Sequence, residues 1–83
     1  MKLLYFATVR ERLGRAEETV DVPAGLQTVQ DLLDWLRARD ESYAVALSED
    51  ARIRAAVDQV HAKPETTIVD AREVAFFPPV TGG

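Results

Sequence analysis

Few residues of this sequence could carry out chemistry, and those that stand out lie at the end of the chain, in the run Pro78-Pro79-Val80-Thr81-Gly82-Gly83. The chain has no cysteine and a single histidine, His61, so it lacks a thiol nucleophile, thiolate metal ligands and the ligand cluster that a metal site requires. No nucleophile is paired with a base, which disfavours an enzyme that acts alone. We therefore expect the terminal carboxylate of Gly83 to be the reactive group.

The residues before the two glycines are suited to presenting this carboxylate to another protein. The two prolines fix φ, and the second favours extended backbone at the first, so the chain should leave the last strand stiffly. The six residues after Phe77 could reach roughly 20 Å at about 3.3 Å each. Val80 and Thr81 are uncharged and the glycines have no side chain, so this tail should fit a narrow channel.

A terminal carboxylate is ionised at neutral pH and is a poor acyl electrophile, so a partner must activate it. An ATP-dependent partner could form an acyl-adenylate, and a persulfide sulfur could then displace AMP to leave a terminal thiocarboxylate. Because the chain has no cysteine, its C-terminus is the only place where it could carry transferable sulfur. A Gly-Gly end alone is more typical of a frayed terminus, so this hypothesis depends on the fold before it.

Size and composition limit the classes of function. The 83 residues, 47% of them hydrophobic, suffice for one small domain, which we place at 1–77, with an extended tail at 78–83. No run approaches the roughly 20 apolar residues that span a bilayer, and no signal peptide is recognisable, so we expect a cytoplasmic protein without a membrane partner. The net charge of −4 disfavours nucleic acid as a partner.

The first half of the chain predicts two strands and the main helix. Residues 1–6 are apolar apart from one lysine, which is typical of a strand that is central in a sheet or covered on both faces. A helical turn over 9–13 should end at Gly14. Residues 18–22 alternate like a strand with one wet face, and the two strands should pair antiparallel.

The strongest helix signal runs over 28–39. One apolar stripe at helical spacing is formed by Val29, Leu32, Leu33 and Leu36. Thr28 and Asp31 have the spacing of a capping box, and Trp35 lies at the margin of the stripe, where we expect it to pack.

The second half predicts mainly strands, over 53–60, 66–69 and 73–77, with a turn at 63–65. Residues 40–50 lack clear periodicity. We expect a loop or short helical turn there, which covers a small hydrophobic contact at the margin of the core. One long helix among four or five strands favours an α+β fold in which the helix packs across a small mixed sheet. This is the β-grasp arrangement of ubiquitin-like proteins.

Three stretches carry a resemblance to a known family. They are the ending EVAFFPPVTGG, the opening LYFATVRE from Leu4 and the middle AVDQ from Ala56. Together they resemble the small subunit of molybdopterin synthase, the sulfur carrier of molybdenum cofactor biosynthesis. Two positions differ from many relatives: Ala71-Arg72 stands in place of Gly-Asp, and Asp58 in place of Asn.

The resemblance implies a reaction at Gly83, which an ATP-using adenylyltransferase similar to the ubiquitin-activating enzymes would adenylate before thiocarboxylation. No cofactor or metal would be bound. The arm that enters the large subunit would consist of Pro78, Pro79, Val80, Thr81 and Gly82. There the sulfur would pass to cyclic pyranopterin monophosphate, with the catalytic side chains on the large subunit, in a heterotetramer of two small and two large subunits.

The resemblance also implies that Phe6 and Phe77 dock on the partner, although burial of either ring in this domain's own core fits the sequence equally well. Two other readings stay open. The chain could carry sulfur for thiamine, cysteine or tRNA thiolation, or it could be a non-catalytic ubiquitin-like module that binds through a sheet edge or apolar face.

Overall fold

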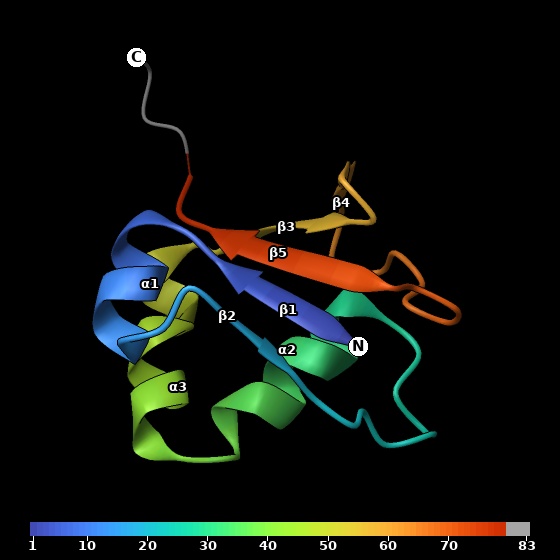
Figure 1. The fold of residues 1–83 in the computed structure, drawn as a ribbon, viewed down its shortest axis with the longest axis horizontal. Coiled ribbons are helices and arrows are strands. Elements are labelled where there is room, and N and C mark those ends of the chain that lie inside the picture. Colours follow the sequence, from blue (N-terminus) through green and yellow to red (C-terminus); the bar gives the residue numbers. More distant parts are fainter. Residues whose placement is uncertain (80–83) are drawn as a thin grey trace.

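The computed structural model describes residues 1–79, which form one sheet with helices against one of its faces (Figure 1). Its elements are β1 (Lys2–Tyr5), α1 (Ala7–Leu13), β2 (Glu17–Thr19), α2 (Val29–Arg37), α3 (Glu41–Ala46), the 3-10 helix η1 (Glu49–Ala51), β3 (Arg54–Val57), β4 (Val60–Ala62) and β5 (Glu73–Phe77). The strand order is β2-β1-β5-β3-β4, with β1 and β5 parallel and the other pairs antiparallel. The predicted β-grasp fold is confirmed.

The two central strands supply the sheet's half of the core. In β1, Leu3 and Tyr5 are buried, and in β5, Val74 and Phe76 are buried, because alternate residues of a strand face the same side. The first strand is therefore central, as predicted, but its pattern shows only one buried face, and Leu4 lies on the other.

The main helix forms as its sequence predicts. The Thr28 side chain accepts a hydrogen bond from the Asp31 backbone N–H (3.1 Å), and the Asp31 carboxylate accepts one from the Thr28 N–H (3.2 Å), so the capping box is complete. The whole predicted apolar stripe is buried. The helix ends at Arg37, two residues earlier than predicted. Gly14 ends α1 in the left-handed conformation, with φ at 74°.

Residues 40–50 differ from the prediction, because they form a helix that belongs to the main core. Asp40 caps α3 by accepting hydrogen bonds from the backbone N–H groups of Ser42 and Tyr43. Tyr43 and Leu47 are buried in the same cluster as the central strands. The helix has six residues, which is too short to show a period in the sequence.

The single strand predicted over 53–60 is wrong, because the chain reverses within it. Asp58 and Gln59 have φ of 47° and 71°, and they form a two-residue turn between β3 and β4. Hairpin turns with positive φ usually contain Asn-Gly or Asp-Gly, and Asp-Gln did not give that signal. The Asp58 carboxylate accepts hydrogen bonds from the N–H groups of Arg72 and Glu73, both at 3.0 Å, so it also holds the turn into β5.

Two further boundaries differ. Residues 66–69 form no strand and contribute only a single bridge, between Thr28 and Thr67. The carbonyl groups of Pro64 and Thr66 are instead used to accept hydrogen bonds from the first N–H groups of α2. The strand predicted over 18–22 spans Glu17–Thr19 instead. The turn predicted at 63–65 is confirmed.

Candidate functional site

The predicted reactive segment is only partly within the described residues. Pro78 and Pro79 follow β5 and are half-buried. Val80, Thr81, Gly82 and Gly83 lie outside the described residues, so the reactive group and the boundary of the tail at 78 stay predictions. The site that can be built from the structure is the surface around the end of β5.

Phe77, the last residue of β5, lies on the face of the sheet that the helices leave uncovered. Phe76 before it points into the core and is fully buried, so alternation places Phe77 on the opposite face. Among the residues that strand register places on that face across β1, β5, β3 and β4, five lie in the two rows nearest the end of β5. We call this the outer face; it comprises Leu4, Arg54, Ala56, His61, Ala75 and Phe77.

The two predicted docking phenylalanines lie near each other at one end of the sheet. The Phe6 N–H donates to the carbonyl of Phe76 (3.1 Å), which fixes Phe6 next to the end of β5. Its side chain is 46% exposed. The rings of Phe77 and His61 meet edge to face, with centroids 5.5 Å apart. Neither phenylalanine belongs to the buried core cluster, so both rings are available at the surface beside residue 78.

The outer face is suited to binding another molecule through apolar contacts. Its middle is formed by Ala75 and Ala56, which lie in register between Leu4 and His61 and contribute only short apolar side chains. His61 is exposed and faces a ring instead of a base or nucleophile.

Among the described residues, no cluster of three metal-ligating side chains occurs. No helix in the described part of the chain is long and apolar enough to cross a membrane.

A polar cluster around Glu18 was missed by the sequence analysis. The Glu18 carboxylate accepts hydrogen bonds from the hydroxyls of Tyr5 (2.7 Å) and Tyr43. Arg15 and Arg39 approach the same carboxylate at 3.2 and 3.6 Å. The Arg39 guanidinium also lies over the ring of Tyr43, 5.0 Å from its centroid. The cluster thus joins β2 to α3 and to the end of α2.

The pKa values in this cluster are shifted by its geometry. Burial raises the pKa of the Glu18 carboxyl, but hydrogen bonds from Tyr43 and Tyr5 and the two nearby arginines outweigh burial, so the net pKa is lowered. Burial, followed by the hydrogen bond to Glu18, raises the pKa of both tyrosines. The partners are 13 and 25 residues from Glu18 along the chain, so no local sequence signal could reveal them.

Comparisons with known proteins agree with the fold. The sequence profile of the ThiS family matches residues 3–83. The chain belongs to the ThiS family. A relative from Escherichia coli named "Molybdopterin synthase sulfur carrier subunit" is 42% identical over 83 residues, covering all of this chain and 99% of the relative. A ThiS-family relative of the same name from Haemophilus influenzae is 30% identical, again over the whole chain.

Solved structures of archaeal proteins share the fold of this ThiS-family member. SAMP1 from Haloferax volcanii superposes with a TM-score of 0.72 at 29% identity and covers 100% of this chain and 98% of its own. A Pyrococcus furiosus protein described as molybdopterin converting factor, subunit 1, gives a TM-score of 0.73 at 30% identity over 95% of each chain. Both likenesses extend over nearly the whole β-grasp domain.

Proposed function

We propose that this chain is the sulfur carrier subunit of a molybdopterin synthase. The observation that carries the proposal is the family match, which runs through residue 83 and includes a 42% identical relative of that name. The proposal is supported by two partly exposed phenylalanines beside residue 78: Phe77 lies on the outer face, and Phe6 is hydrogen-bonded to the end of β5. The folded body would bind partners, and the tail would enter their active sites.

The proposed reaction takes place at Gly83. An adenylyltransferase joins the carboxylate to the AMP portion of ATP and releases pyrophosphate. A persulfide then attacks the carbonyl carbon, forming a C–S bond while the C–O bond to AMP breaks. A second thiol cleaves the resulting S–S bond by disulfide exchange and leaves a terminal thiocarboxylate. In the synthase, the sulfur passes to cyclic pyranopterin monophosphate and the carboxylate is regenerated by water.

The partner supplies the catalytic side chains in this proposal, and the assembly is a heterotetramer of two small and two large subunits. Carriers for thiamine, cysteine or tRNA thiolation would pass through the same thiocarboxylate. Reconstitution with each candidate acceptor separates these pathways: sulfur should reach the pyranopterin and not the other acceptors.

The proposal is tested by mass spectrometry of the chain after incubation with its adenylyltransferase, ATP and a persulfide donor. One oxygen should be replaced by one sulfur, and fragmentation should place the change on Gly83. Localisation is required because oxidation of Met1 gives nearly the same change in mass. An unmodified terminus in a mixture that consumes ATP would contradict the proposal.

Docking through the outer face predicts a loss of affinity in the Phe77→Asp variant. A central aromatic anchor is typically worth at least about 2 kcal/mol at an interface, so binding to the large subunit should weaken about 30-fold or more. Isothermal titration calorimetry measures the change. Val69→Asp is the control, because Val69 is 59% exposed and lies outside the outer face. Equal affinities for the two variants would exclude Phe77 from the interface.

A further inference from the structure

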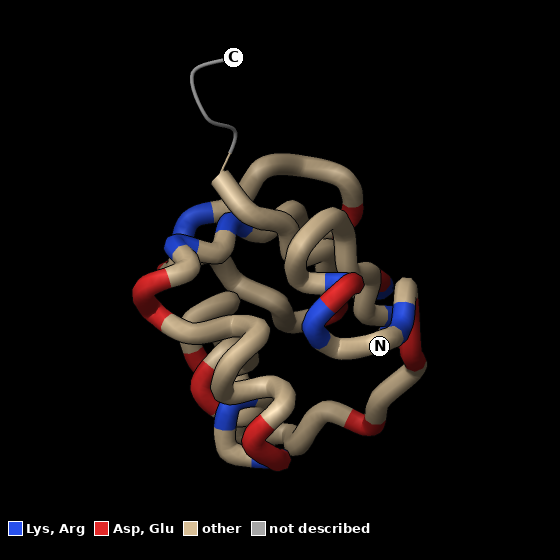
Figure 2. The backbone as a smooth tube through the Cα atoms, turned by 90° about the vertical axis from the view of Figure 1, so that its left-hand side faces the viewer, with Lys and Arg blue, Asp and Glu red and all other residues tan. Residues whose placement is uncertain are grey.

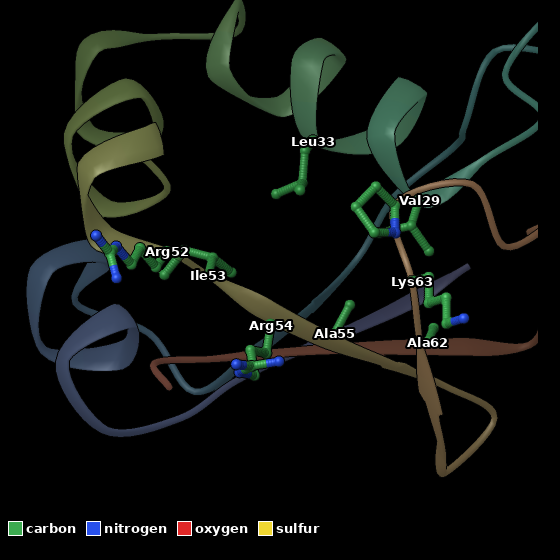
Figure 3. A pocket seen from close by; sticks show the side chains of 9 residues that line it. Val29, Leu33, Arg52, Ile53, Arg54, Ala55, Ala62 and Lys63 are labelled. Carbon is green, nitrogen blue, oxygen red and sulfur yellow. The ribbon is translucent and has the colours of Figure 1, made fainter. Parts of the chain in front are cut away.

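A concave surface lies on the helix side of the sheet, between α2 and the β3–β4 hairpin (Figure 3). Its volume is about 320 Å³. The floor is apolar and includes Val29, Leu33, Ile53 and Ala55, and Leu33 points toward Ala55 across it (Figure 3). Two cationic residues, Arg52 and Lys63, border the groove; Arg54 also contributes to its lining, but its side chain points to the other side of the sheet, away from Leu33 (Figure 3). We call this surface the α2–β3 groove.

We propose that the α2–β3 groove binds an extended acidic segment of a partner protein. One apolar side chain of that segment would pack between Leu33 and Ala55. Its carboxylates would lie near the cationic residues that border the groove. The inference concerns a face of the domain opposite to the outer face, and the proposed function does not assign it a role.

Charge complementarity identifies the class of ligand. The chain is acidic overall, with a net charge of −4, yet no aspartate or glutamate lines this groove. Within residues 1–79, the side chains of Arg52 and Lys63 form no ion pair, so no acid neutralises their charge. The groove is therefore a local positive region on an acidic protein, which favours an anionic partner.

The positive charge comes from side chains and not from the start of α2. The N–H groups of Val29 and Gln30 donate to the carbonyls of Thr66 and Pro64 at 3.0 and 2.9 Å. The Asp31 N–H donates to the Thr28 hydroxyl. Because these N–H groups already donate hydrogen bonds within the domain, the start of α2 does not form a binding site for a single phosphate.

The spacing of the cations favours an extended chain. Arg52 lies at one end of the groove and Lys63 at the other, and their side chains point away from each other (Figure 3). A compact anion needs donors that converge on one point, whereas separated carboxylates along a peptide match this arrangement. No aromatic ring lines the groove, so it lacks the stacking platform that single-stranded nucleic acid uses.

The backbone at the arginine end is fixed by local structure. Arg52 ends η1 in the left-handed conformation, with φ at 53°, and its N–H donates to the Glu49 carbonyl (3.0 Å). Arg54 pairs with Phe77 at the start of the proposed tail. Figure 2 shows basic residues of the chain gathered near that point. A partner that binds the tail would thus lie close to the arginine end of the groove, a step that rests on the proposed function.

The test uses a short fluorescein-labelled peptide in which glutamates flank a central Leu-Phe pair, titrated into the full ¹⁵N-labelled chain. Fluorescence anisotropy measures affinity, and amide chemical shifts locate the site. Shifts should centre on Leu33, Ile53 and Ala55. A peptide with glutamine in place of glutamate should bind about 10-fold more weakly or worse, because only the charge is removed.

The double variant Arg52→Glu and Lys63→Glu should lower peptide affinity at least about 10-fold. Its matched control is Arg10→Glu with Arg12→Glu, which changes the net charge equally on α1, outside the groove. An equal loss in both variants, equal binding of the glutamine peptide, shifts on the outer face, or no binding of the acidic peptide would each overturn the proposal. Because the assay contains no activating enzyme or acceptor, its failure leaves the proposed sulfur transfer unaffected.

Discussion

Deletion of Gly83 should abolish sulfur transfer while the domain stays folded. Removing one extended residue shortens the tail by about 3.3 Å, and a misplacement of about 1 Å at a reacting centre can cost roughly 100-fold in rate. We therefore expect the rate of molybdopterin formation to fall more than about 100-fold in a reconstituted assay with the adenylyltransferase and the large subunit. The melting temperature should not change, since the buried core cluster ends at Phe76.

Two matched variants separate the length of the tail from its chemistry. Gly83→Ala keeps the length and the carboxylate and adds only a methyl group, so it should retain more activity than the deletion. One alanine added after Gly83 moves the carboxylate beyond its proposed position and should be as inactive as the deletion. If the deleted chain transferred sulfur at the normal rate, the carboxylate of Gly83 could not be the sulfur site, and a binding module would be the better interpretation.

Replacement of Glu18 by alanine should give the largest loss of stability among surface-accessible acids. It removes the acceptor of two tyrosine hydroxyls, and each largely buried donor left without a partner costs about 1–3 kcal/mol. We expect the free energy of unfolding to fall by about 2–4 kcal/mol in urea titrations. Glu17→Ala is the control on the same strand, because its ion pair with Lys2 is exposed and should contribute at most about 1 kcal/mol. Equal losses in both variants would rule out the cluster's role.

The same carboxylate predicts a dependence of stability on acid. The folded pKa of Glu18 is below its ordinary value of 4.5, so the charge contributes stability above pH 4.5 that is lost as the pH falls through the folded pKa. The stability difference between the wild type and Glu18→Gln should therefore shrink below pH 4.5. Comparing the two proteins cancels the contribution of Asp31 and Asp40, whose pKa values are also lowered. A difference independent of pH would contradict the assignment.

The sequence by itself determined the features that depend on neighbouring residues. Thr28, Asp31 and the apolar stripe defined α2, since capping and helical period act within a few residues. Gly14 marked the end of α1, and the apolar run after Ala71 marked the last strand. The order of these elements and the Phe-Phe-Pro-Pro-Val-Thr-Gly-Gly ending were sufficient to predict the β-grasp fold and the family.

Only the tertiary structure decided the features that depend on distant residues. The Asp58 carboxylate joins the β3–β4 hairpin to the start of β5, because it accepts hydrogen bonds from Arg72 and Glu73, 14 and 15 residues away. The Glu18 cluster and the α2–β3 groove likewise assemble side chains from separate elements. In β5, Phe76 is buried and Phe77 faces outward. The sequence left this choice open, because strand register and not residue type sets which of two adjacent rings packs in the core.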